Sequence, residues 1–299
     1  KRTINSCINQ TLSKSKYEII IINDASTDKT KKNIKSKIKN FKNYTLINLK
    51  KKMGPGIARN YGLRYAAGKY IIFVDGDDQL QNNTLKIISK KLILNPDIVT
   101  FNFNKIFNKK KINHARKDFL KITNNKIKLI NNFLSGEIDG SVIFTCFKKN
   151  LIFKNNIKFP KGLHEDITFI FQAYILAKKI IKINSCLYIK NEVKNSITSS
   201  VNFNRINDLL TVHSKMIRII KKMHLYKKKM YYYSMRGFIG YASDSIMEVL
   251  NNKNFSKSQK NRLIRLIKKK SLNFKEFKKY SYKTRKDIIF KKFISSNIK

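Results

Sequence analysis

The chain has 299 residues, 42% of them hydrophobic, which is enough to fill the core of one large domain or two modest ones and excludes a disordered chain. Its 65 Lys and Arg against 18 Asp and Glu leave a net charge of +47, which first suggests nucleic acid or an anionic membrane as partner. Lys far outnumbers Arg, and Ile and Asn are also abundant, as expected from an A- and T-rich genome. We therefore expect no nucleic-acid partner.

The cysteines indicate the redox compartment, and the longest apolar runs show whether a segment can span a membrane. Cys7, Cys146 and Cys186 are far apart and odd in number, which argues against a disulfide framework or zinc cluster and for a reducing compartment. Apolar runs end after about five residues, far short of the ~20 needed to span a bilayer. The sequence predicts no transmembrane helix and a cytoplasmic location.

The first hundred residues alternate between short runs rich in Ile, Val and Phe and segments of helical periodicity. The runs, predicted as strands, are residues 18–23, 44–49, 70–74 and 97–101. The predicted helices include residues 3–12, a segment around 34–41, residues 55–67 and a segment around 85–92. This alternation predicts a right-handed, doubly wound α/β fold with a mostly parallel sheet.

The pattern changes after residue 101. We predict helices at residues 126–134 and 165–178, and strands at 141–147 and 180–188. From residue 199 onward the pattern is helical, with 26 basic against 5 acidic residues. The predicted domains are therefore 1–198 and a basic helical region at 199–299. His213 and His224 lie in polar helical stretches and are expected at the surface.

Three acidic residues, Asp75, Asp77 and Asp78, follow the strand at 70–74 directly, with Gly76 between the first two. In an extended run, side chains two residues apart face the same way, so Asp75 and Asp77 can face one ion, with Gly76 allowing close approach. Two carboxylates with open positions suit Mg²⁺ or Mn²⁺. A simple capped turn is the alternative, since Asp and Gly are common turn residues.

Two further segments lie where a doubly wound sheet places its ligand, after a strand or at a helix start. Asp24 follows the strand at 18–23 and could bind a base or ribose, while Ser26 to Asp28 could cap the next helix. Residues 54–60 open a helix with two glycines and Arg59, a place for an anion. A third acidic pair, Glu165 and Asp166, opens a later helix and could simply favour that helix start.

These segments together resemble family 2 glycosyltransferases of the GT-A fold. The matching pieces are IIIINDASTD, GPGIARNYG and YIIFVDGDD, then the stretch 147–159 before HEDITF, and 188–198 ending in NSIT. The resemblance covers roughly the first 200 residues. It implies a GT-A domain at 1–198, with a nucleotide-binding half at 1–100 and an acceptor half at 101–198.

The resemblance also implies roles for individual residues. Asp166 is expected as the catalytic base, and Asp77 with Asp75 as the ligands of Mg²⁺ or Mn²⁺. The expected substrate-binding residues are Asp24 at the nucleobase, Arg59 beside the nucleotide, Asp75 at the ribose or metal, and Ser26, Gly76, Asp78 and Glu165. His164 is the one histidine considered near the site.

Two departures from the family pattern bear on the donor site. Ala25 stands where the family usually has Gly, and residues 190–194 lack the arginines common before NSIT. The family also has a strand before the helix at 3–12, so we expect a fragment of a longer protein. In that case the strands at 18–23 and 70–74 stand two strand spacings, ~10 Å, apart with an open channel between them.

The sequence therefore predicts an inverting glycosyltransferase that moves sugar from a nucleotide-diphosphate-sugar donor to a bacterial surface glycan or a lipid-linked acceptor. Because such acceptors are often lipid-linked, we expect the basic region to contact the inner face of the cytoplasmic membrane peripherally. The alternatives are a noncatalytic nucleic-acid or membrane-surface binding module on a degenerate transferase fold, and a nucleotidyltransferase. Intact acidic clusters argue against the first, and a Gly-rich basic loop after the first strand would indicate the second.

Overall fold

The computed structural model describes residues 2–107, 110–114, 118–191, 203–227, 229–251, 255–271, 288 and 290. The chain divides into two compact units. Unit 1 comprises Lys1–Asn124 and Gly140–Lys194, and unit 2 comprises Asn125–Asp139 and Asn195–Lys299. Within the described ranges, no helix combines the length and the hydropathy needed to cross a bilayer.

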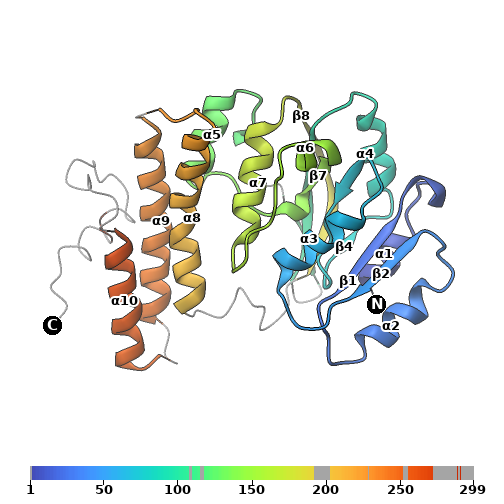
Figure 1. Ribbon diagram of the computed structural model, residues 1–299, viewed down its shortest axis with the longest axis horizontal. Helices are drawn as coiled ribbons and strands as arrows, with labels where there is room; N and C mark the ends of the chain where they lie inside the picture. Colours follow the sequence, from blue (N-terminus) through green and yellow to red (C-terminus); the bar gives the residue numbers. More distant parts are fainter. Residues whose placement is uncertain are drawn as a thin grey trace. The chain divides into compact units, whose positions relative to one another are not determined.

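Unit 1 contains all the described strands, and Figure 1 shows them flanked by helices. The strands are β1 (Ile19–Asn23), β2 (Tyr44–Asn48), β3 (Tyr70–Ile72), β4 (Gln79–Leu80), β5 (Ile98–Phe107), β6 (Lys110–His114), β7 (Thr145–Lys148) and β8 (Ile180–Asn191). The α-helices are α1 (Arg2–Ile8), α2 (Thr30–Ile38), α3 (Pro55–Tyr65), α4 (Thr84–Leu92), α6 (Lys149–Lys154) and α7 (Glu165–Leu176). Short 3₁₀ turns lie at Lys14–Lys16, Phe119–Lys121 and Val142–Phe144.

The predicted fold class is confirmed, but the sheet is mixed rather than mostly parallel. β1 pairs with β2 in parallel, and β5 pairs with β8 in parallel. β7 runs antiparallel to both β3 and β5, and β4 and β6 are antiparallel to their partners. The sequence pattern missed this because an apolar run buried on both faces reads the same whichever way its neighbours run.

β1 and β3 do not pair with each other. β1 and β2 form a separate two-stranded sheet. The other sheet has six strands: five follow the order β3-β7-β5-β8-β4, with β3 at an edge, and β6 pairs with β5 outside this order. A cavity of about 1280 Å³ is lined by all of β1 and by Tyr70, Ile72 and Val74. One cavity therefore borders both strands, and their expected separation of ~10 Å stays a prediction. The four isoleucines of β1 are only half-buried, because one side of their strand faces this space.

An aromatic cluster in unit 1 supports the segment before α7. Phe159 stacks on Phe169 with ring centroids 3.9 Å apart, and Phe73 meets both rings edge-on. Phe147 of β7 packs edge-on against Phe169. Edge-to-face contacts of this kind add to the free energy of apolar burial and fix the relative orientation of the rings. The cluster thus ties the residue after β3 to the start of α7.

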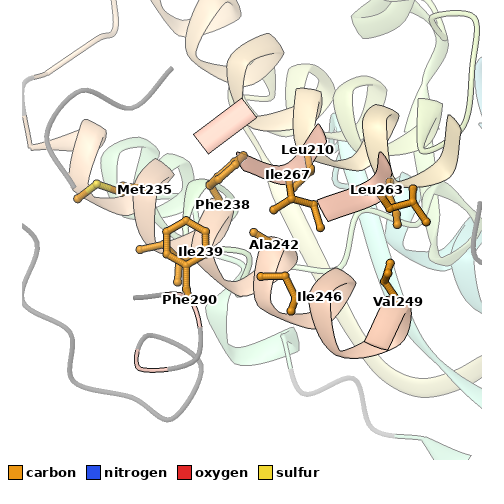
Figure 2. Packing of buried hydrophobic residues seen from close by; sticks show 11 residues of the cluster. Leu210, Met235, Phe238, Ile239, Ala242, Ile246, Val249, Leu263, Ile267 and Phe290 are labelled. Atoms are coloured by element: carbon orange, nitrogen blue, oxygen red, sulfur yellow. The ribbon is translucent and has the colours of Figure 1, made fainter. Parts of the chain in front are cut away.

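Unit 2 consists of helices packed on an apolar core, as predicted for residues beyond 199. Its helices are α5 (Lys126–Leu134), α8 (Phe203–Lys222), α9 (Met230–Asn251) and α10 (Lys257–Ser271). α9 presents Met235, Phe238, Ile239, Ala242, Ile246 and Val249, which are spaced three or four residues apart and therefore share one face. Figure 2 shows these side chains meeting Leu210, Leu263, Ile267 and Phe290.

The division into units differs from the predicted domains at Asn125–Asp139 and at residues 195–198, both of which belong to unit 2. Helix α5 forms where predicted, yet it belongs to unit 2, whereas the sequence interpretation placed it in the first domain. Leu129, Ile130, Phe133 and Leu134 are its buried residues. β5 runs through residue 100, at which the sequence interpretation divided the first domain. The two functional halves of that domain stay a prediction.

Candidate active site

The acidic segment after β3 forms a tight turn. The amide of Asp78 donates to the carbonyl of Asp75 over 3.1 Å, which closes the four-residue turn. The Asp75 side chain is 39% exposed, and Gly76 and Asp77 are exposed, whereas Asp78 is 2% exposed. Two carboxylates of the predicted cluster therefore face outward and one faces inward.

Arg59 joins two of the predicted acidic clusters. Its Nη2 lies 2.8 Å from Oδ1 of Asp75, and its Nη1 lies 2.7 Å from Oε1 of Glu165. The guanidinium also lies over the ring of Phe159, 5.4 Å from its centroid. Burial acts to lower the pKa of Arg59. The surrounding carboxylates outweigh this effect, so the pKa is raised, with the largest contribution from Asp75 and smaller ones from Glu165 and Asp166. One side chain thus brings together residues 90 positions apart in the sequence.

The start of α7 is packed closely against α3. A Cβ added at Gly56 would lie 2.5 Å from Cγ of Glu165 and 3.0 Å from the carbonyl oxygen of Pro160. Asn60 and Phe159 exchange two hydrogen bonds, of 2.8 and 3.0 Å, between amide side chain and backbone. Gly56 therefore allows close helix approach, and its position against protein atoms is not the anion approach that the sequence suggested.

His164 precedes the acidic pair and adopts a left-handed backbone, with φ 57° and ψ 29°. Such a conformation is costly for a residue other than glycine and is held by surrounding structure. Glu165 is buried, whereas Asp166 is half-buried in the same first turn. The Glu165 carboxylate forms an ion pair with Arg59, and the Asp166 carboxylate is the more accessible of the two.

Asp24 fixes the loop that leads into α3. Its two oxygens accept hydrogen bonds from the amides of Met53 and Gly54, at 2.7 and 2.8 Å. Gly54 caps α3 with φ 88°, a conformation that favours glycine. The next residue after Asp24, Ala25, also has a positive φ of 52°, at the position where the family usually has Gly. The contact of Asp24 with a nucleobase stays a prediction.

The polar end of the 1280 Å³ cavity lies among the predicted donor residues. Asp24, Ser26 and Gly76 line this cavity. The amide of Ser26 donates to Oδ1 of Asn23, and Asn23 in turn donates to Asn48 at the end of β2. The end of β1 and the turn after β3 therefore border one space, as the ligand-binding rule for α/β sheets predicts.

Comparison with known proteins decides the family. A sequence profile described as "Glycosyl transferase family 2" matches residues 1–155. The chain belongs to this family of glycosyltransferases. The resemblance drawn from the sequence motifs is therefore confirmed.

Several family members of known name are similar in sequence. The cholesterol galactosyltransferase of Borreliella burgdorferi is 31% identical over 211 residues, which cover 66% of this chain and 58% of that protein. The poly(ribitol-phosphate) beta-glucosyltransferase of Bacillus spizizenii is 32% identical over 185 residues, 59% of this chain and 27% of that protein. An uncharacterized glycosyltransferase of Haemophilus influenzae is 30% identical over 262 residues, 80% and 90% of the two chains. The chain thus spans little more than half of the first relative and about a quarter of the second.

Solved structures share the fold. Residues 1–349 of Staphylococcus aureus TarS in complex with UDP superpose with a TM-score of 0.67 at 21% identity, covering 90% of this chain and 76% of that one. The mannosyltransferase PcManGT of Pyrobaculum calidifontis, in complex with GDP-Man and Mn²⁺, gives a TM-score of 0.54 at 16% identity, covering 92% and 83%. At these identities the likeness establishes the GT-A fold.

The carboxylates of the acidic turn suit a divalent metal that is completed by substrate. Among the described residues, no group of three or more His, Cys, Asp or Glu side chains forms a complete metal site. Asp77 is exposed, and Asp75 uses only Oδ1 for Arg59 in the contacts found. Mg²⁺ is typically held by one or two carboxylates together with substrate phosphates, so this donor set fits such an ion without a full cage.

Asp78 has protein partners for both carboxylate oxygens. Oδ2 accepts from the hydroxyl of Tyr188 at 2.9 Å, and Oδ1 accepts from the amide of Asn191 at 2.8 Å. Burial raises the pKa of Asp78 to about 6, although these hydrogen bonds act in the opposite direction. Its direct contact with substrate, which the family resemblance implied, has no support in this geometry.

The sequence interpretation gave no role to Asn60, Tyr188 or Asn191. Asn60 and Tyr188 stand inside the quoted family motifs, and a polar residue next to Arg59 was a usable signal. Asn191 also lies in the quoted stretch 188–198, but nothing in the sequence indicated its partner Asp78, which lies 113 positions away. Residues 192–198, which include the NSIT motif and most of the segment lacking arginines, lie outside the described residues.

Proposed function

We propose that this chain is an inverting glycosyltransferase that moves sugar from a nucleotide-diphosphate-sugar donor to a hydroxyl group of a bacterial cell-envelope glycan or lipid-linked acceptor. The observation that carries the proposal is the double ion pair of Arg59 with Asp75 and Glu165. It draws the acidic turn after β3 and the acidic start of α7 into one site. A transferase needs both, one for the donor diphosphate and one for the acceptor proton.

Asp166 is the proposed catalytic base. It follows Glu165 directly on α7, and Glu165 is paired with the same Arg59 that pairs with Asp75, which supports a place for Asp166 in this site. As the acceptor oxygen attacks the anomeric carbon, the carboxylate of Asp166 takes the hydroxyl proton, and the diphosphate leaves from the opposite face. Attack opposite the leaving group inverts the configuration. Glu165, held by Arg59, keeps the first turn of α7 in position.

The donor is proposed to bind along the cavity end bordered by Asp24, Ser26 and Gly76. A Mg²⁺ or Mn²⁺ ion held by Asp77 and Asp75 would stabilise the negative charge of the departing diphosphate. A nucleotide-diphosphate donor is supported by two fold neighbours, TarS with UDP-GlcNAc and PcManGT with GDP-Man and Mn²⁺. Relatives named for poly(ribitol-phosphate) and for cholesterol support an envelope or lipid acceptor.

Unit 2 is proposed to make a peripheral contact with an anionic membrane on the cytoplasmic side. The apolar residues Leu263 and Ile267 of α10 are packed in the core of unit 2. Lys257, Arg262, Arg265 and Lys269 of the same helix are exposed. The available face of α10 is therefore basic, so we expect binding by charge and not by insertion, at about 1 kcal/mol per basic residue near the surface. Sedimentation with anionic and neutral vesicles, at low and high salt, tests this contact.

Substitution of the two proposed chemical groups tests the function. With a panel of UDP- and GDP-sugars and Mn²⁺, Asp166→Asn should lower turnover by roughly 10²- to 10⁴-fold while UDP binding survives. Asp77→Asn should lower turnover too and, in addition, remove the metal dependence of UDP binding. Asp208→Asn, in unit 2, is a matched control and should leave both unchanged. Equal loss of UDP binding in both site variants would refute the separate roles.

A further inference from the structure

The acidic turn at residues 75–78 is held through its backbone from several directions. Tyr188 accepts from the amide of Asp75 at 3.2 Å, and the side-chain amide of Asn191 donates to the carbonyl of Asp77 at 2.6 Å. The hydroxyl of Thr3 donates to the carbonyl of Gly76 at 2.7 Å. The backbone on each side of the exposed Gly76 is therefore fixed by side chains from elsewhere in unit 1.

Asp78 connects these holding groups to one another. Its carboxylate accepts hydrogen bonds from the hydroxyl of Tyr188 and from the backbone amide of Asn191. These are the two residues that also hold Asp75 and Asp77. A tyrosine hydroxyl has one proton to donate and lone pairs to accept, and Tyr188 uses both capacities here. Asp78, Tyr188 and Asn191 are all buried, with exposed fractions of 2, 0 and 8%.

A simple turn at the surface does not need this arrangement. Its exposed backbone groups could bond to water, whereas burying a carboxylate costs free energy that its hydrogen bonds only offset. What the network adds is geometry, because it fixes two backbone positions whose side chains, Asp75 and Asp77, face outward. Functional side chains need this kind of support, since a displacement of ~1 Å can lower a rate by about 10²-fold.

We propose that Tyr188 and Asn191 are positioning residues, which hold the backbone of Asp75 and Asp77 directly, are anchored by the buried carboxylate of Asp78, and so set the spacing of Asp75 and Asp77. Asp78 is thereby assigned to the support of the turn and not to substrate. The inference rests on the proposed function for its chemical consequence, because Asp75 and Asp77 are the groups proposed to hold the metal. It adds two residues of β8 to the machinery of the site.

Hydrogen exchange tests the geometry without any substrate. In Tyr188→Phe the amide of Asp75 loses its acceptor, and exchange at residues 75–78 should accelerate by roughly tenfold. Tyr70→Phe is the matched control, because it removes the hydroxyl of a half-buried strand tyrosine, which donates to the carbonyl of Pro96 at 2.9 Å and has no hydrogen bond to the turn among the described contacts. Unchanged exchange at 75–78 in Tyr188→Phe would overturn the inference, whatever the protein's activity.

Metal dependence separates positioning from a general structural role. We expect Tyr188→Phe and Asn191→Ala to raise the Mn²⁺ concentration that half-saturates UDP binding, and to lower kcat by roughly 10- to 100-fold with little change in acceptor KM. Excess Mn²⁺ should partly restore UDP binding in these variants but not in Asp77→Asn. Faster exchange at the turn without any change in Mn²⁺ dependence would reduce the network to a structural role and overturn the proposal. If the unmodified protein binds no nucleotide and transfers no sugar, the proposed function fails, and the exchange result alone decides whether the turn is held as inferred.

Discussion

Unit 1 and unit 2 differ in how they accommodate buried ionisable side chains. In unit 1, the buried carboxylates of Asp78 and Glu165 have partners that connect them to the site. In unit 2, neither ring nitrogen of His213 nor the hydroxyl of Ser234 has a hydrogen-bond partner within the described part of the chain. Unit 1 thus uses burial to place charged groups, whereas unit 2 is held together mainly by apolar packing. Changes to these buried groups should therefore affect both chemistry and stability in unit 1, and stability in unit 2.

The largest effect is expected from Arg59→Ala. The variant leaves Glu165 buried without its cation, and breaking a buried pair by removing one partner costs about 3–5 kcal/mol. Transfer should fall by about 10²-fold or more, because the two acidic segments lose the side chain that joins them. Denaturant unfolding and steady-state kinetics measure the two effects.

Arg64→Ala provides the control on the same helix. Arg64 lies over the ring of Tyr61, 5.1 Å from its centroid, and has no ion pair with a site carboxylate among the contacts found. We expect a stability change below about 1 kcal/mol and normal kinetics. If the two variants behaved alike, Arg59 would not be the link between the clusters.

Acid should weaken unit 2 through His213. Burial lowers the pKa of His213 to about 3, so it stays neutral when folded and becomes protonated when the unit unfolds. The contribution of neutral His213 to the free energy of unfolding is complete above its ordinary pKa of about 6.5. This contribution falls with decreasing pH, and about 2 kcal/mol of it is lost at pH 5. His213→Leu should remove this dependence, whereas His224→Leu, at an exposed histidine, should retain it. Unfolding curves of unit 2 between pH 7 and pH 4 decide the matter.

Two glycines of α9 allow a sharper test of packing in unit 2. A Cβ at Gly237 would overlap the carbonyl oxygen of Leu134 and lie 2.5 Å from Cε1 of His213, whereas a Cβ at Gly240 meets nothing within 4 Å. Gly237→Ala should cost about 1–3 kcal/mol, because a backbone carbonyl cannot move aside easily. Gly240→Ala should stabilise by up to about 1 kcal/mol, through helix propensity. Thermal melts that rank the two variants in the opposite order would contradict this packing.

The smallest effect is expected at Ala25. Its φ of 52° is unfavourable for a residue with a Cβ, and glycine adopts it readily. Ala25→Gly should stabilise unit 1 by about 0.5–1 kcal/mol, because relief of this conformation exceeds the extra entropy of the unfolded chain. A lower denaturation midpoint for this variant would show that surrounding contacts, and not the backbone, set the conformation of the loop.

Local signals in the sequence predicted most elements of both units. The helix at 126–134 has the predicted bounds, and the starts of β1, β2, β3 and α3 lie within one residue of prediction. Periodicity and cap residues act over a few positions, so they can be read without tertiary contacts. Strand β4, with two residues, and helix α6, with six, were missed because elements so short carry little periodic signal. Strand β6 was missed because its sequence, KKINH, is mostly polar.

The sequence by itself determined the order of strands and helices, the positions of the acidic clusters and, through the spacing of its motifs, the family. Tertiary structure alone decided that Asp78 faces inward while Asp75 and Asp77 face outward, since this depends on Tyr188 and Asn191 more than 100 positions away. It likewise buried His213, predicted at the surface, because α5, α8 and α9 close around Gly237. Burial is set by which distant segments pack together, and neither residue type nor local spacing carries that information.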